Sequence, residues 1–179
     1  NGARQEGVSY SQRTIHQRRR ISTARGFLHP ALKRGNIDVR TNALCSRVLF
    51  GGENGKRATG VEYVRGGKTQ SVRARREVIL CGGTVNSPQL LQISGIGPAA
   101  LLKKIGVPVV HDLPAVGENL RDHYPVRMTA RVKGVDTLNE RSRGLPLVKE
   151  VAKYFLGGKS ILSLSPTLVY VFWRSNEAL

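Results

Sequence analysis

The chain has 179 residues, 40% of them hydrophobic, and a formal net charge of +17 at pH 7. That apolar share is typical of a folded protein and argues against disorder. No apolar run reaches the roughly 18 residues of a membrane-spanning helix. The start of the chain, residues 1–20, is polar and lacks the apolar stretch of a secretory signal. The composition predicts one domain, or parts of two.

The positive charge has two interpretations. A basic chain can bind nucleic acid or an anionic membrane surface. The densest basic runs are "RRR" at 18–20 and "RARR" at 73–76, and the other bases are scattered along the chain. Aromatic residues do not alternate with the bases, as a stacking platform for single strands would require. We therefore favour a solvated basic surface, with a nucleic-acid-binding module as the alternative.

The cysteines and histidines predict neither a disulfide framework nor a metal site. Cys45 and Cys81 are the two cysteines, and they form no Cys-x-x-Cys pair. Two unpaired cysteines favour a reducing compartment such as the cytoplasm, although the location stays open. None of the histidines has metal-ligand spacing. They are His16, His29, His111 and His123.

The first elements in chain order are a strand and a short helix. Residues 7–19 alternate in polarity, which indicates a strand exposed on one face. Ser22 or Thr23 is a suitable N-cap for a helix that follows. Gly26 and Pro30 weaken this helix. Its apolar residues are Phe27, Leu28 and Leu32.

A β-rich block follows. Residues 36–50 alternate as a strand, and residues 59–76 predict a hairpin that turns at Gly66-Gly67. The segment "EVILC" (77–81) is short, apolar and β-branched, which predicts a parallel strand buried between two layers. Cys81 is then a small buried apolar residue. These patterns predict a small antiparallel meander that leads into a buried strand.

The stretch "GGTVNSPQLLQISGIG" (82–97) predicts a turn, a helix and a second turn. Ser87 is the expected N-cap and Pro88 the expected first helical residue. Gly95 suits the position just past the helix end, where φ is often positive. The segment "PAALLKKI" (98–105) predicts a second helix, closed by Gly106.

The last third of the chain mixes a loop, strands and a helix. Residues 107–124 form a Pro- and Gly-punctuated loop, and residues 125–134 alternate as a half-buried strand. Residues 144–158 have helical spacing of apolar residues. Residues 165–173, "SPTLVYVFW", predict a final strand.

Three familiar motifs fail. The letters "GIGPAA" (95–100) fit a dinucleotide fingerprint, but they follow a predicted helix and not a strand. "GGKS" (157–160) would be a P-loop only with Gly in place of Lys153. Asp122 and His123 could form an acid–base pair, although adjacent loop residues rarely face each other. The residues alone thus predict an α/β chain with a ligand-facing turn at 82–87.

The segment "GTVNSPQLLQISGIG" (83–97) resembles the second signature of the glucose–methanol–choline (GMC) oxidoreductases, which is a small pair, Ser-Pro, two aliphatics and Ser-Gly-aliphatic-Gly. The stretches "RRRISTARGFL" (18–28) and "LPAVGENLRDH" (113–123) resemble other parts of the family in order and spacing. The stretch "VKGVDTLNERSRG" (132–144) is most similar to the choline- and alcohol-dehydrogenase branch.

This resemblance implies that the chain is the central part of a flavoprotein. The expected fold class is α/β, and α+β for the protein overall. A Rossmann-like FAD-binding domain with a small antiparallel meander would be interwoven with an antiparallel-sheet substrate domain. Residues 20–122 would belong to the FAD-binding domain, and residues 1–19 and 123–179 to the substrate-binding domain. The implied reaction is oxidation of a primary or secondary alcohol, choline-like or other, with hydride transfer to flavin N5 of FAD. The electron acceptor is left open.

The resemblance also implies three cofactor contacts. Cys45 stands where the family usually has Val, whose backbone pairs with the adenine, and Gly82 and Gly83 end a strand beside the adenosine half of FAD. No histidine matches the context of the family's catalytic His, so no catalytic residue is assigned. The alternatives are an ordinary strand residue for Cys45 and a plain tight turn for the glycines. For the whole chain, a non-catalytic relative or remnant is the further alternative.

Overall fold

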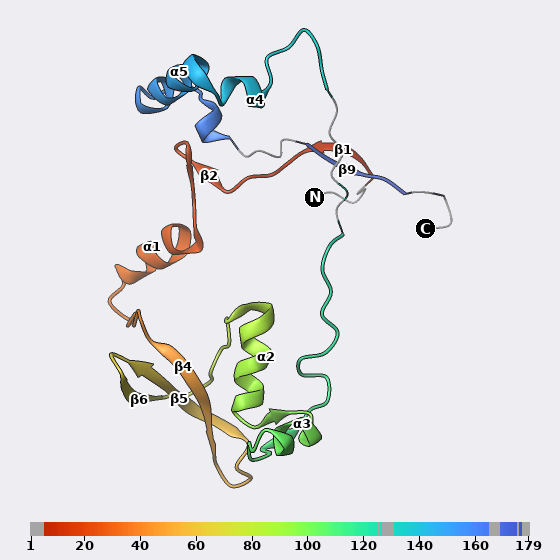
Figure 1. Cartoon of the computed structure of the whole chain (residues 1–179). Helices are drawn as coiled ribbons and strands as arrows, with labels where there is room; N and C mark the ends of the chain where they lie inside the picture. The colour runs from red at the N-terminus through yellow and green to blue at the C-terminus, as the bar shows by residue number, and fades with distance from the viewer. Residues whose placement is uncertain (1–5, 125, 127–130, 165–168, 175, 177–179) are drawn as a thin grey trace. The chain divides into compact units, whose positions relative to one another are not determined.

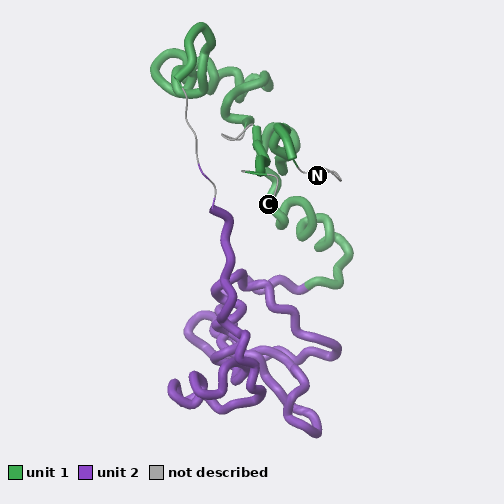
Figure 2. The backbone as a smooth tube through the Cα atoms, turned by 90° about the vertical axis from the view of Figure 1, so that its right-hand side faces the viewer, with its two compact units in different colours: residues 1–37, 128–179 green, residues 38–127 purple. Residues whose placement is uncertain are grey.

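The computed structural model describes residues 6–124, 126, 131–164, 169–174 and 176. The chain forms two compact units, residues 38–127 (unit 2) and residues 1–37 with 128–179 (unit 1), which Figure 2 colours purple and green. The predicted domain limits, 1–19, 20–122 and 123–179, stay predictions. No helix of the described residues is long and apolar enough to cross a membrane.

Unit 2 contains a three-stranded antiparallel sheet with the order β4-β5-β6, which confirms the predicted meander (Figure 1). The β5–β6 turn is made by Gly66 and Gly67 with φ of +57° and +73°. Such angles suit glycine and the twist of a two-residue hairpin. The strands and helices of unit 2 are β4 (Leu44–Gly51), β5 (Arg57–Arg65), β6 (Lys68–Arg73), α2 (Gly83–Ile93), β7 (Ile96–Gly97), α3 (Ala99–Lys104) and β8 (His111–Asp112).

The prediction of a buried parallel strand at residues 77–81 is wrong. These residues form no strand, Ile79 is 73% exposed, and Cys81 is exposed as well. A buried strand needs hydrogen-bonded neighbours on both sides. No strand of the part of the chain that the structure describes pairs with this segment. Composition indicated an apolar strand, whereas the neighbours that would bury it are not among the described residues.

The first turn of α2 also differs from the prediction. The helix begins at Gly83, with Gly82 as its N-cap, so Ser87 is not the N-cap and Pro88 lies inside the helix. Proline has no N–H to donate to a carbonyl one turn earlier, and its ring crowds that turn. The helix therefore contains a local defect between its start and Pro88. The predicted end is confirmed, since Gly95 follows the helix with φ +92°.

The turn after α2 joins three segments. The Ser94 hydroxyl accepts a hydrogen bond from the Val48 N–H in β4 (2.9 Å) and donates one to the Leu90 carbonyl (2.5 Å). The Gly95 carbonyl accepts from the Val110 N–H (2.8 Å). A Cβ on Gly95 would lie 2.5 Å from the Pro108 carbonyl oxygen, so only glycine fits here. These contacts explain the serine and the first glycine of "SGIG".

The helix α3 and the strand pair β7–β8 complete unit 2. β7 runs parallel to β8, with Ile96 opposite His111 and Gly97 opposite Asp112. The Asp112 carboxylate accepts a hydrogen bond from the Ala99 N–H (2.8 Å), so it caps α3 from across the turn. Leu102 of α3 is fully buried.

Unit 1 is built from short elements. The predicted strand at 7–19 is interrupted twice: β1 ends at Tyr10, and a hairpin turn at Gln17 and Arg18, both with positive φ, separates β2 from β3. The final strand is confirmed for residues 169–172, where β9 pairs antiparallel with β1, and the helix predicted at 144–158 is α5. The elements are β1 (Gly7–Tyr10), β2 (Ile15–His16), β3 (Arg19–Arg20), the π-helical turn η1 (Ala24–Leu28), α1 (His29–Leu32), α4 (Leu138–Arg141), α5 (Gly144–Phe155), the 3-10 turn η2 (Ile161–Ser163) and β9 (Val169–Phe172).

The prediction of a strand at 125–134 falls mostly outside the described residues. Of this segment, residues 126 and 131–134 are described and none belongs to a strand. Residues 165–168 of the predicted final strand also lie outside them.

Candidate cofactor-binding site

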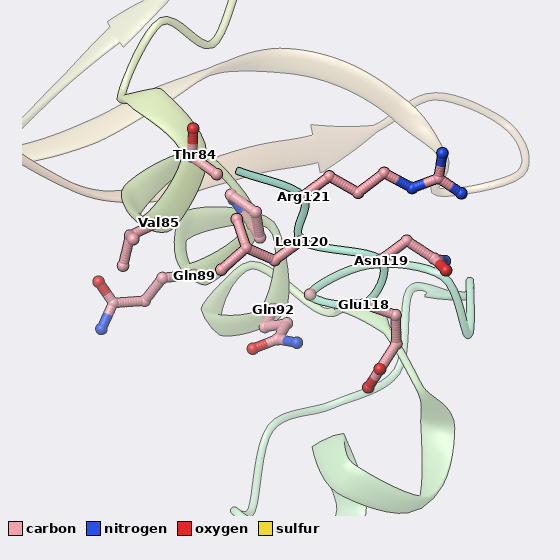
Figure 3. A pocket seen from close by; sticks show the side chains of 10 residues that line it. Thr84, Val85, Gln89, Gln92, Glu118, Asn119, Leu120 and Arg121 are labelled. Carbon is pink, nitrogen blue, oxygen red and sulfur yellow. The ribbon is translucent and has the colours of Figure 1, made fainter. Parts of the chain in front are cut away.

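An open groove of about 590 Å³ runs between α2 and the loop at residues 117–121 (Figure 3). Its volume is in the range of small-molecule sites, about 300–1,000 Å³. The side chains of Thr84 and Val85 come from the first turn of α2, immediately after Gly83, and Arg121 belongs to the facing loop, with its guanidinium extended away from the helix. The lining residues are Thr84, Val85, Pro88, Gln89, Gln92, Gly117, Glu118, Asn119, Leu120 and Arg121.

The two predicted glycines differ in their surroundings. Gly83 has φ +86°, and no heavy atom lies within 4 Å of the place where its Cβ would sit. Gly82 has an ordinary helical φ of −75°, but a Cβ there would lie 3.2 Å from the Asn86 Cβ and 3.3 Å from the Ser87 N–H nitrogen. Packing within the helix start thus favours glycine at 82, and backbone conformation favours it at 83. The open space at Gly83 fits the close approach of a ligand.

The loop across the groove is fastened to α2 by one side chain. Gln92 Nε2 donates a hydrogen bond to the Val116 carbonyl (3.0 Å). A Cβ on Gly117, which has φ +92°, would lie 2.7 Å from that same nitrogen. Asn119 also has a positive φ, +59°, which asparagine tolerates better than most residues. The loop conformation at Asn119 and Arg121 is therefore set by the Gln92–Val116 hydrogen bond and by the positive φ of Gly117 and Asn119.

Cys45 lies on β4, half-buried, opposite Tyr63 of β5. The register shifts between Cys45 and Arg47, so Ser46 forms a β-bulge. Bulges are over-represented beside active sites, where they redirect side chains. Within the described residues β4 is an edge strand, so no strand occupies its outer row of backbone groups. That arrangement is compatible with a ligand pairing with the backbone near Cys45.

A charged cluster lies beside the same sheet, at Tyr63 of β5. The Arg40 guanidinium bonds Asp38 (3.0 Å) and the Tyr63 hydroxyl, and it lies over the Tyr63 ring at 5.6 Å. The Tyr63 hydroxyl donates in turn to Gln70 Oε1 (2.8 Å). The hydrogen bonds to Asp38 and then to Tyr63 raise the pKa of Arg40. The cluster keeps the Arg40 guanidinium, paired with Asp38, beside Tyr63, the residue opposite Cys45.

The structure brings the elements of the predicted residues together. Cys45 lies on β4, and the two glycines begin α2, which packs on that strand. The hydrogen bond that joins the two elements is made at Ser94, at the other end of the helix. Sequence reasoning did not predict the groove residues Gln92, Asn119 and Arg121. The signal that could have found them is the positive-φ glycine at 117, inside the stretch that resembles the family loop.

Two further predictions concern catalytic and metal groups. The Asp122 carboxylate accepts a hydrogen bond from the His123 backbone N–H (2.8 Å), which is a local turn contact and not an acid–base pairing of side chains. No group of three or more His, Cys, Asp or Glu side chains of the described residues could hold a metal ion. We assign no catalytic residue.

The chain is similar to several known flavoenzymes and choline dehydrogenases. It is 52% identical over 126 residues to the mitochondrial choline dehydrogenase of Homo sapiens, covering 70% of this chain and 21% of that protein. It is 53% identical over 178 residues to the oxygen-dependent choline dehydrogenase of Pectobacterium carotovorum, covering 99% of this chain and 31% of that one. The chain thus spans about a fifth to a third of the length of these curated relatives.

The chain is also similar to solved structures of oxidoreductases. An FAD-dependent oxidoreductase from Chaetomium thermophilum superposes with a TM-score of 0.78 at 28% identity, covering 91% of this chain and 29% of that one. A fungal aryl-alcohol oxidase superposes with a TM-score of 0.77 at 26% identity, covering 93% and 29%. The fold is therefore that of the FAD-dependent oxidoreductases.

The particular family follows from the sequence match. The model of the GMC oxidoreductases matches residues 1–125. The chain belongs to the GMC oxidoreductase family. The predicted family, fold class and cofactor, FAD, are confirmed.

Proposed function

We propose that this chain is the central part of an FAD-dependent oxidoreductase that acts on the CH–OH group of a small alcohol. The single observation that carries the proposal is the start of α2, where Gly83 has a positive φ and open space at the place of a Cβ, in a member of the GMC family. Family membership favours this function over a basic nucleic-acid-binding module.

The chain's own residues would hold FAD through its backbone. The bulged strand around Cys45 would pair with the adenine, and Gly82 and Gly83 would let the helix start approach the adenosine half. The groove that begins at Thr84 would receive a neighbouring part of the cofactor, and the Arg121 guanidinium suits an anionic group such as a diphosphate. When bound, FAD accepts the hydride from the alcohol carbon.

The substrate proposed is choline or a similar alcohol. Its support is the identity, above 50%, to proteins named choline dehydrogenases. The Pectobacterium relative is named oxygen-dependent, and the electron acceptor of the present protein is left unassigned. The residues proposed here contact the cofactor, and none of them is a general base. The base that removes the hydroxyl proton would therefore be another residue.

The test is to obtain the complete reading frame that contains this chain, purify its product and record the flavin absorbance before and after adding choline. We expect the oxidised flavin bands to be present and to bleach with choline. A product with flavin that other alcohols bleach, but not choline, would retain the reaction class and reject the substrate. A natively purified product without flavin would reject the proposal and favour a non-catalytic remnant.

A further inference from the structure

The side chain of Gln92, in the last turn of α2, lies between two glycines. A Cβ on Gly97 would lie 3.0 Å from the Gln92 Cγ, and a Cβ on Gly117 would lie 2.7 Å from the Gln92 Nε2. Either glycine would therefore crowd Gln92 if it carried a side chain. Gly97 is the last residue of "SGIG", and its φ lies outside the left-handed region. The room that it leaves for Gln92, and not its backbone conformation, therefore favours glycine at this position.

The Gln92 amide completes a series of hydrogen bonds that hold the loop after β8. The Leu113 N–H donates to the Gly97 carbonyl (3.0 Å), and the Val116 N–H donates to the Leu113 carbonyl (3.1 Å). The Gln92 Nε2 donates to the Val116 carbonyl (3.0 Å). Residues 83–93 and 113–121 are all described, and this is the one hydrogen bond that joins them. The loop is thus tied to α2 through Gln92 alone.

This bond joins the two walls of the candidate groove. Residues 117–121 form one wall and α2 forms the other, with Gln92 beside the loop (Figure 3). The loop wall begins at Gly117, directly after the residue whose carbonyl accepts from Gln92. The separation of the two walls therefore depends on this bond. A binding site needs walls that neighbouring contacts hold in place.

We propose that Gln92 is a positioning residue for the cofactor, which ties the loop at residues 117–121 to α2, sets the width of the groove and slows the release of FAD. The inference rests on the proposed function, in which this groove receives part of FAD. Gln92 acts through the loop, because its Nε2 is bonded to the Val116 carbonyl. Its side chain is half-buried, and a single neutral hydrogen bond contributes modestly. Its loss should therefore speed FAD release and leave FAD binding intact.

The test uses the complete protein with FAD bound and follows FAD release after dilution by flavin fluorescence. Gln92→Met keeps the length of the side chain and removes the donor, so release should be about three- to tenfold faster than in the parent. Gln92→Glu, whose ionised carboxylate has no proton to donate, should release FAD at least as fast. Gly106→Ala is the control, because it strains the backbone at φ +73° with no atom within 4 Å of the Cβ. It should release FAD at the parent's rate.

Hydrogen exchange and a double-mutant cycle test the route through the loop. Exchange at residues 117–121 should accelerate in Gln92→Met. Gly97→Ala should speed FAD release in the parent and have little further effect in Gln92→Ala, which has no Cγ to crowd.

Three results would overturn the proposal in different ways. Equal release from Gln92→Met and the parent would reject Gln92 and leave the proposed function standing. Faster release with unchanged exchange at residues 117–121 would replace positioning by direct contact between Gln92 and the cofactor. A parent protein without flavin would reject the proposed function, and this inference with it.

Discussion

The two units differ in what they bury. In the described part of unit 2 the buried hydrophobic residues are Val48, Tyr63 and Leu102, and they lie on a sheet and a helix. In the described part of unit 1 the buried residues are polar, namely Ser11, Glu150 and Ser160. Apolar burial is the main stabilising contribution in folding, whereas a buried ion cluster contributes little net stability. Unit 2 should therefore be the more stable unit.

The groove and the predicted cofactor contacts lie in unit 2, the unit with the apolar core, as a fixed framework for a binding site requires. Large apolar residues are exposed in both units. Tyr10 of unit 1 is 84% exposed, and Leu44 and Ile79 of unit 2 are each 73% exposed.

The largest effect is expected from Leu102→Ala. Leu102 is fully buried, so its truncation should lower the free energy of unfolding by about 2–5 kcal/mol. Leu101→Ala in the same helix is the control, because Leu101 is 38% exposed. Hydrogen exchange read separately for β4–β5 and for α5 is the measurement. Loss of protection in α5 as large as that in β4–β5 would show that the two units are not independent.

Gly95→Ala should destabilise unit 2 by on the order of 3 kcal/mol, from left-handed backbone strain and a clash with Pro108 and Val110. Gly106→Ala is the control, since Gly106 has φ +73° but no atom within 4 Å of a Cβ. It should cost only the strain, about 1–2 kcal/mol. Denaturant titration checks both, and equal costs would mean that the segment after α2 yields to the added methyl group.

Ser94→Ala should cost about 1–3 kcal/mol, because it leaves the Val48 N–H without its buried partner. Ser71→Ala on the exposed strand β6 is the matched control and should be close to neutral. Thermal unfolding compares the two variants. A neutral Ser94→Ala would contradict the role of this hydroxyl in joining α2 to β4.

The smallest expected effect is a loss of stability in unit 1 at low pH. The hydrogen bond from Arg141, followed by that from Ile161, lowers the pKa of Glu150 from 4.5 to about 2. Because the folded pKa is the lower one, the stabilisation is complete above pH 4.5 and is lost as the pH falls towards 2. Hydrogen exchange of α5 should thus accelerate over that interval, and less so in Glu150→Gln. Glu53→Gln, in an exposed turn, should behave like the parent chain.

Local patterns predicted much of the fold. The Gly66-Gly67 hairpin, the C-terminal ends of α2 and α3 and the position of α5 depend on neighbours in sequence, and the structure confirms them. The strand at 77–81 was wrong because burial depends on partners distant in sequence. The cap at Ser87 was wrong because the helix begins a turn earlier, at Gly83. The groove was not predictable for the same reason, since Gln92 bonds Val116 across 24 residues.

The resemblance supplied what periodicity could not. Nothing in the spacing of Cys45, Gly82 and Gly83 indicates that their elements are in contact, because this contact comes from α2 packing on β4. The Ser94–Val48 bond behind that packing joins residues 46 apart. A motif such as "SGIG" therefore encodes a tertiary contact that is visible only in the folded structure.

The most direct test of the proposed cofactor site compares Gly83→Ala with Gly106→Ala in the complete protein. Both glycines have positive φ, +86° and +73°, and both have open space where a Cβ would sit, so the backbone strain is matched. The FAD released per mole of purified protein is the measurement. The account predicts that FAD content falls in Gly83→Ala and stays at the parent level in Gly106→Ala. Full FAD content in Gly83→Ala, or equal losses in both variants, would contradict it.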